Sequence, residues 1–315
     1  MTDAAAAVTS AAATVLEPAR AEAVGALAER SRGVLPTVLT HASVRHFDPA
    51  PLPDDVLAAL EAALVRGPTS SALHSYTHVL VRDPERKREL AVLAGDQPWI
   101  ERAALMIVGC ADLRRAREAT HAQGYRYTAH DLRMLISATA DLTVGLQNAS
   151  LVAQSLGFGT VMIGGVLNGS LEIAGLLRLP QRVVPLVGLA VGRPHGGHWP
   201  APRPRLPLPL LVHHETWSLD EPAERELFAA CDAETRAQGT FEGRRIPWQA
   251  MGLGGVDPVP EGDYGWLEHT ARKQGRATWG SQGAKVDVDL PAQGLRVKGT
   301  GEVDPAPPPT DDAGR

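Results

Sequence analysis

Cysteine is nearly absent from this sequence, which has only Cys110 and Cys231 among 315 residues. Two thiols cannot build a disulfide framework or a cysteine-rich metal centre. Cys110 lies inside the apolar run AALMIVGCADL, so we expect a buried and unreactive thiol. A reducing cytoplasm is the simplest compartment for such a chain.

An excess of positive charge and a long hydrophobic run are also missing. Lys and Arg number 31 against 36 Asp and Glu, and the net charge of −5 argues against a general nucleic-acid binder. No apolar run reaches the roughly 18 residues that a membrane-spanning helix needs. The N-terminus lacks the basic segment and apolar core of a secretory signal. We therefore expect no nucleic-acid and no membrane partner.

Hydrophobic residues make up 44% of the chain, enough for a sizeable core. The patterning predicts three parts: a low-complexity, Ala-rich extension over 1–30, one folded domain over 31–279, and a polar, Pro- and Gly-rich tail over 280–315 that we expect to be mobile. Within the domain, β-branched runs alternate with amphipathic segments, which indicates an α/β or α+β fold around one sheet. The strands are expected at 77–83, 104–112, 160–165 and 183–194, and the helices at 54–66, 170–180, 223–236 and 262–278.

The longest periodic segment runs from about 129 to 156. Apolar or small residues recur along it at helical spacing, which predicts one long helix. A helix of this length spans roughly 40 Å. That is long for the surface of a monomer, and the small residues of its stripe allow close approach, so packing against a second subunit is plausible. Glycines in GFG (157–159) end it.

Familiar catalytic strings are missing: the sequence has no GxGxxG after a strand, no GxxxxGK[ST], no GxSxG and no HExxH. The run VHHE (212–215) contains metal-binding residue types. Adjacent histidines on a strand point to opposite faces, however, so His213 and His214 chelate poorly together. We expect no metal site.

Four segments carry residues suited to binding an anion or a planar ligand. THASVRHFDPAPLP (40–53) places a serine, an imidazole and an arginine before a helix, although a capped loop explains it as well. RGPTSSALH (66–74) is rich in hydroxyls, which usually only make turns. In GFGTVMIGGV (157–166) two glycines follow a strand, where a ligand could approach the backbone or the chain could simply turn.

The fourth segment is APRPRLP (201–207). Its prolines hold the backbone extended, so Arg203 and Arg205 are expected to project on the same side, a good match for a phosphate. The alternative is a PxxP ligand for another protein. The segment runs directly into the apolar LPLPLLV, which favours chain packed on a core.

Taken in order, these segments resemble the motifs of the FMN-dependent nitroreductase/flavin reductase superfamily, in particular its NADPH-using nitroreductase A and flavin reductase P group. The opening signature H-R-S-x-R-x-F corresponds to HASVRHF (41–47), the serine loop to PTSSALH, and the Gly-x-Gln segment to AGDQPW. The YIGG turn corresponds to MIGG (162–165) and the K-x-R-L-P arm to RPRLP (203–207). The resemblance covers residues 35–217, about 60% of the chain, with a fainter echo in EHTARKQGRATW.

The resemblance implies an α+β nitroreductase-like fold. Its central sheet is mostly antiparallel and flanked by helices, and the protein is an obligate homodimer with a long interface helix. It also implies a set of FMN-binding residues. These are His41, Ser43, Arg203 and Arg205 at the phosphate, Arg45 and Gln97 at the pyrimidine edge, Ser70 and Ser71 at the ribityl or pyrimidine portion, the N–H of Gly164 at flavin N5, and Ile163 and Gly165 against the ring.

By the same resemblance the protein is an NAD(P)H oxidoreductase that works by ping-pong hydride transfer through flavin N5. NADPH or NADH would be the co-substrate, and the oxidant a nitroaromatic, a quinone or free flavin. The chemistry belongs to the FMN, so no catalytic side chain is expected, and Arg45 would tune the flavin by stabilising negative charge on its reduced form.

Several residues depart from the family pattern. Ala42 stands where close relatives have arginine, Arg203 replaces a lysine, Leu167 an arginine and His74 a glutamine. The loop that holds the coenzyme's 2′-phosphate has no clear match, and Arg244, Arg245 and Arg272 are the candidates. The missing cation at Ala42 and the divergent C-terminal region keep one alternative open, a flavin carrier or sensor without efficient turnover. A second alternative is a specialised biosynthetic flavin dehydrogenase, because this fold accepts many oxidants and function does not follow from fold. A proline-rich interaction module is the weaker third.

Overall fold

The computed structural model describes residues 33–296 and six residues before them, without the side chains of residues 277–284. The predicted extension over 1–30 therefore falls almost entirely outside the described residues, as does the end of the chain from 297. The described chain forms two compact units. The first comprises the residues up to Ala42 together with Ala201–Gly283, and the second comprises Ser43–Pro200 together with the residues from Ala284.

The second unit is built on a five-stranded sheet with the order β1-β5-β3-β2, and β4 also pairs with β5. Every strand pair in it is antiparallel, in agreement with the mostly antiparallel sheet that the family resemblance implied. The long central strand β5 pairs with β3 on one side and with β1 and β4 on the other. The strands are β1 (Phe47–Asp48), β2 (Tyr76–Val81), β3 (Leu105–Asp112), β4 (Gly159–Ile163) and β5 (Val183–Pro194).

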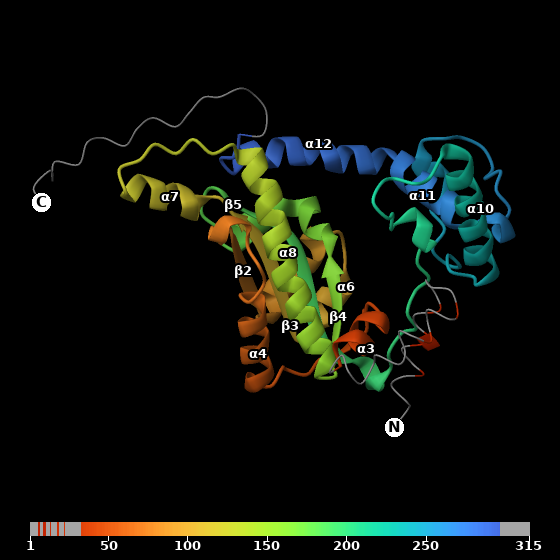
Figure 1. The fold of residues 1–315 in the computed structure, drawn as a ribbon, viewed down its shortest axis with the longest axis horizontal. Helices are drawn as coiled ribbons and strands as arrows, with labels where there is room; N and C mark the ends of the chain where they lie inside the picture. The colour runs from red at the N-terminus through yellow and green to blue at the C-terminus, as the bar shows by residue number, and fades with distance from the viewer. Residues whose placement is uncertain are drawn as a thin grey trace, which may run out of the picture. The chain divides into compact units, whose positions relative to one another are not determined.

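Helices cover both faces of this sheet, and each face has its own apolar core. On one face lie α4 (Asp54–Leu64) and α8 (Asp131–Ser155), whose leucines and alanines pack on alternate residues of β3 and β5. On the other face lie α5 (Pro84–Leu93), α6 (Pro98–Arg102), η2 (Gly164–Gly169) and α9 (Ser170–Leu176). Figure 1 shows α8 running along the sheet beside α4. The predicted site residues are divided between these two faces.

The predicted long helix is confirmed as α8, which ends before Gly157 in the left-handed conformation, with φ 81°. At Gly145 the small residues of α8 allow close packing. A Cβ there would come within 2.5 Å of the Leu64 carbonyl oxygen and 3.0 Å of His78 Nε2. Glycine thus lets α4 and the imidazole of His78 approach the backbone of α8 closely. The prediction for Cys110 is also confirmed, since burial raises the pKa of this fully buried thiol to about 12.

The predicted mobile tail over 280–315 is wrong for its first part, because α12 (Ala277–Ala292) continues through it. From residue 284 onward this segment packs in the second unit. Leu290 and Leu295 are buried there, and Lys285 donates to Glu172 at 2.8 Å and to the carbonyl of Asn168 at 3.0 Å. Local composition gives little sign of this helix, which is held by tertiary contacts. The predicted boundary at 279/280 therefore falls inside α12, while the boundary at 30/31 stays a prediction.

The first unit contains α3 (Val34–Leu39), α10 (Glu221–Ala237), α11 (Trp266–Gly275) and short 3₁₀ turns. Its centre is the buried guanidinium of Arg272, which is 2% exposed. This group pairs with Asp257 at 2.6 Å and with Glu268 at 2.7 Å, and it lies over the rings of Trp248 and Tyr264. Among the described residues no helix has the length and apolar character needed to cross a membrane.

Candidate functional site

The sheet face that carries α5, α6 and η2 brings together three of the predicted motifs. Gln97 immediately precedes α6, and its Nε2 donates to the carbonyl of Ala94 at 2.6 Å. A Cβ on Gly165 would overlap both that carbonyl oxygen and Gln97 Nε2, so the glycine turn and the glutamine lie in direct contact. We call this group, together with Arg45 and Trp99 described next, the glycine–glutamine cluster.

Arg45 joins the cluster through the aromatic ring of Trp99, which no pattern in the sequence indicated. Its guanidinium carbon lies over Trp99, 5.7 Å from the ring centroid. Trp99 is on α6, two residues after Gln97. The position of Trp99 beside Arg45 could not be read from the sequence, because it depends on how α6 packs against the loop before β1.

The segment HASVRHF (41–47) pairs with β4 through its backbone. The backbone N–H of Val44 donates to the carbonyl of Thr160 at 2.9 Å, and Ser43 forms a bridge with the same residue. Ile163, at the end of β4, is 1% exposed and belongs to the core on the face of the glycine–glutamine cluster. Ser43, Arg45 and the glycine turn are thus all fixed by the two ends of this five-residue strand.

Two observations test whether FMN fits here. A Cβ on Gly164 would meet nothing within 4 Å, in contrast to the tightly packed Gly165, so the exposed Gly164 faces open space where a planar ring could approach its backbone. Trp99 Nε1 is buried and has no hydrogen-bond partner among the described residues. A buried donor left unpaired costs about 1–3 kcal/mol, so an acceptor from a ligand is a natural complement. The residues present fit the cofactor.

The serine loop lies on the other face of the sheet. Ser70 donates its N–H and its hydroxyl to the carboxylate of Asp141 on α8, each at 3.0 Å. Three non-glycine residues of this loop have positive φ: Ser71 (53°), Ala72 (54°) and His74 (48°). Such strained backbone is typical of loops that a surrounding structure holds in one shape, often at functional sites. The structure therefore does not bring Ser70 and Ser71 to the glycine–glutamine cluster of the same chain.

The remaining phosphate-binding candidates belong to the first unit. His41 follows α3, and its N–H donates to the carbonyl of Val38 at 3.4 Å. Arg203 and Arg205 are exposed on an irregular segment, where Arg205 Nη1 donates to the carbonyl of Arg203 at 3.3 Å. Their meeting with Ser43 at a phosphate stays a prediction.

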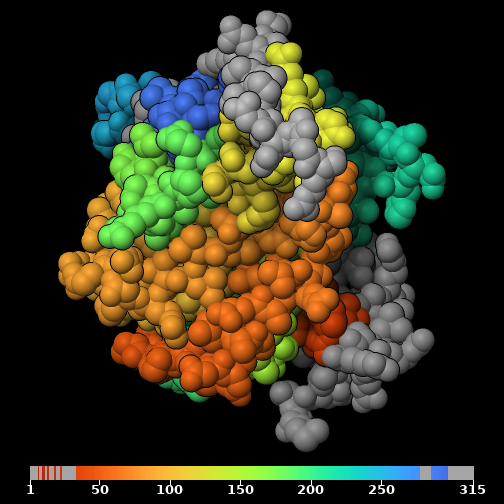
Figure 2. Space-filling view, turned by 90° about the vertical axis from the view of Figure 1, so that its left-hand side faces the viewer, coloured from red at the N-terminus to blue at the C-terminus, as the bar shows by residue number. Residues whose placement is uncertain are grey.

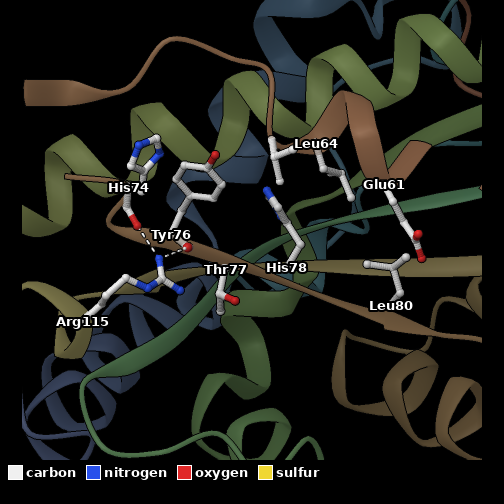
Figure 3. A pocket seen from close by; sticks show the side chains of 9 residues that line it. Glu61, Leu64, His74, Tyr76, Thr77, His78, Leu80 and Arg115 are labelled. Atoms are coloured by element: carbon white, nitrogen blue, oxygen red, sulfur yellow. Dashed lines mark hydrogen bonds between the residues drawn. The ribbon is translucent and has the colours of Figure 1, made fainter. Parts of the chain in front are cut away.

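A cavity of about 450 Å³ opens between α4 and the edge strand β2 (Figure 3). Side chains of Leu64 and Glu61 line it from α4, and those of Tyr76, His78 and Leu80 from β2. Arg115 donates to the carbonyls of His74 and Tyr76 at its rim. None of the predicted FMN-binding residues lines this cavity. In Figure 2 the side of the molecule that carries it is formed mainly by the orange segment with α4 and β2.

His78 is the unusual group of that cavity. Both of its ring nitrogens are buried without a hydrogen-bond partner among the described residues. Burial lowers its pKa to about 4, so the imidazole is neutral at pH 7. The centroid of the Tyr76 ring is 5.3 Å away.

Comparison with known proteins connects these features to characterised relatives. The nitroreductase family model matches residues 38–193. An FMN reductase (NADPH) of Bacillus subtilis is 34% identical over 186 residues, which cover 58% of this chain and 74% of that protein. An oxygen-insensitive NADPH nitroreductase of Salmonella typhimurium is 34% identical over 219 residues, which cover 66% of this chain and 84% of that protein. The solved structure of the NfrA1 nitroreductase of Bacillus subtilis superposes with a TM-score of 0.71 at 26% identity, over 83% of this chain and 98% of that one.

Proposed function

Because the chain belongs to the nitroreductase family, as its motifs predicted, we propose that it is an NAD(P)H-dependent FMN oxidoreductase of the nitroreductase or flavin reductase type. The observation that supports this proposal most directly is the glycine–glutamine cluster, in which Gly164 faces open space while Gly165 packs on Gln97. FMN, when bound, would take hydride from NAD(P)H at N5 and pass electrons to a small-molecule oxidant.

The chain's own residues then bind, orient and tune the cofactor. Gly164 is an exposed residue directly after β4, where its N–H would donate to N5. Gln97 is held by its bond to Ala94 and presents its remaining amide groups to the ring edge. Arg45 supplies positive charge where the reduced ring gains negative charge, which favours reduction. The buried side chain of Ile163 holds the start of the glycine turn in place.

We further propose that each FMN site is built by two copies of the chain. Ser70 is fixed to α8 on one face of the sheet, and Gln97 and Gly165 contact each other on the opposite face. The serine loop and the glycine–glutamine cluster can therefore contact the same FMN only if the serine loop comes from a second subunit. The exposed Ile136 (64%) and Leu132 (41%) on α8 supply apolar surface for such a dimer.

Mixed dimers test this arrangement. A chain with Arg45→Ala and a chain with Ser70→Ala and Ser71→Ala should each bind FMN weakly. Co-expressed, they should form heterodimers with one intact site, because one chain supplies Arg45 and the other the serines. Tandem affinity tags isolate the heterodimer, and its flavin content is then measured. If FMN binding stays as weak as in the two parents, both sets act within one chain.

The visible spectrum of the purified protein tests the proposed activity. We expect bound or added FMN to be bleached rapidly by NADPH under argon and to regain its colour on addition of a quinone. A protein that takes up no flavin would refute the proposal. A bound flavin that NADPH does not bleach would instead favour the carrier or sensor.

Arg244 is the best candidate of the three arginines considered for the coenzyme phosphate. Arg245 pairs with Asp257 at 2.7 Å and with Glu261 at 3.1 Å, and Arg272 is buried against Asp257 and Glu268. Arg244 is exposed. Burial, and then the charges of Lys273, Arg244 and Arg276, lower the pKa of His269, so this part of the first unit is locally positive.

Replacing Arg244 should therefore discriminate between the two coenzymes. We expect Arg244→Ala to raise KM for NADPH about fivefold, since one exposed charge–phosphate contact contributes roughly 1 kcal/mol, and to leave KM for NADH unchanged. Arg225→Ala is the control, because Arg225 is an exposed arginine of the same unit that pairs with Glu221 at 2.6 Å. Equal effects on both coenzymes would contradict a phosphate-specific role.

A further inference from the structure

Trp99 has no assigned part in the reaction, yet it provides the surface on which Arg45 lies. The guanidinium carbon is 5.7 Å from the centroid of the indole ring. A cation over an aromatic face at this distance is attracted by the ring quadrupole, and Trp is the strongest partner among the aromatic side chains.

The indole is the better anchored of the two groups. Trp99 lies in the short helix α6, whose first residue is Pro98. Ile100 and Ala103, on the same segment, are fully buried, and the Trp99 ring packs against the core of this face. Arg45, in contrast, comes from the loop before β1 and has a long side chain with many rotamers. The ring therefore restricts the guanidinium rather than the reverse.

The position of the guanidinium affects the flavin's two redox states unequally. Reduced FMN carries a negative charge on its pyrimidine edge that oxidised FMN lacks, so a fixed cation there binds the reduced form more tightly. If the cation can swing away, the preference falls. Tighter binding of the reduced form is equivalent to a higher reduction potential.

We propose that Trp99 is a positioning residue, which holds Arg45 at the pyrimidine edge of FMN and thereby raises the reduction potential of the bound cofactor. The proposal rests on the proposed function, because it needs FMN in the glycine–glutamine cluster. It assigns a role to a side chain for which the family resemblance implies none.

The test uses the full-length protein with Trp99→Leu and Trp99→Phe. Dissociation constants of oxidised FMN are measured by fluorescence quenching, and reduction potentials by equilibration with a reference dye. We expect Trp99→Leu to weaken binding of reduced FMN about threefold more than binding of oxidised FMN, because the guanidinium loses the aromatic face that holds it at the pyrimidine edge. At about 30 mV per tenfold change for a two-electron couple, the potential falls by about 14 mV. Trp99→Phe keeps a weaker π face, so its reduction potential should lie between those of Trp99→Leu and the wild-type protein.

The Arg45→Ala background separates positioning from a merely structural role. If Trp99 acts through Arg45, Trp99→Leu lowers the potential in the wild-type background and leaves it unchanged when Arg45 is already alanine. An equal fall in both backgrounds would overturn the proposal, and so would an unchanged potential in Trp99→Leu. If Trp99→Leu retains no FMN, Trp99→Phe decides in the same two backgrounds.

The failure of the proposed function looks different from the failure of this inference. A wild-type protein that binds no FMN refutes the function before any variant is made. A wild-type protein that binds and reduces FMN, with a potential that does not respond to Trp99, refutes the inference alone.

Discussion

A Gly165→Ala variant is expected to lose FMN and to unfold at a lower temperature than the wild-type protein. The added Cβ would overlap the carbonyl oxygen of Ala94 and Nε2 of Gln97. That carbonyl cannot move freely, because it follows α5 and accepts hydrogen bonds from Gln97 at 2.6 Å and from Asn168 at 3.5 Å. Overpacking of this kind costs about 1–3 kcal/mol. For a chain of this size we expect Tm to fall by about 5 °C, as measured by calorimetry without added FMN.

Gly164→Ala is the matched control, because a methyl group there meets nothing within 4 Å. We expect it to fold with an unchanged Tm and still to bind FMN more weakly, since the methyl group enters the space assigned to the flavin ring. The adjacent glycines thus separate a packing role from a binding role. If Gly164→Ala bound FMN as tightly as wild type, the flavin would not lie against this turn.

The sequence was informative wherever a residue's role is local. Gly164, Gly165 and Gln97 follow or precede regular elements at fixed offsets, so their motifs could be recognised along the chain, and the structure brings the glutamine and the glycine turn into contact. The strand at 104–112 was recognisable because burial on both faces requires a continuous apolar run. The strand at 77–83 was recognisable because its β-branched residues favour strands. Observed β2 and β3 differ from those ranges by one or two residues.

What the sequence could not show depends on tertiary packing. The division of Ser70 and Gln97 between opposite faces follows from the pairing order of the sheet, which hydrophobic periodicity does not encode. Ser70 gave no sign of its partner Asp141, which is 71 positions away. The helix over 277–292 was missed because it contains two glycines, a proline and β-branched residues, and its contacts with Glu172 and Asn168 are distant in sequence.

The second large effect that we expect is a loss of stability in mild acid that depends on His78. Burial lowers the pKa of this imidazole to about 4 in the folded protein, against about 6.5 when the chain is unfolded. The unfolded state therefore binds more protons than the folded state between these values, and the free energy of unfolding falls as pH drops from 6.5 to 4. Complete protonation of His78 lowers the free energy of unfolding by about 3 kcal/mol, and about 2 kcal/mol of this is already lost at pH 5. Glu61 and Arg115 line the same cavity and are kept unchanged in the test.

His78→Leu should remove this dependence, because the ring nitrogens have no hydrogen-bond partner to lose among the described residues and leucine fills much of the same apolar space beside Leu64. Urea unfolding measured every half unit from pH 7 to 4.5 should give a flatter stability curve for the variant, with the difference from wild type growing as the pH falls. His198→Gln, at an exposed position of the same unit, should follow the wild-type curve. A His78→Leu curve parallel to wild type over the whole range would show that this imidazole takes up its proton as easily in the folded protein as in the unfolded chain. The cavity between α4 and β2 would then admit enough water to solvate the charge.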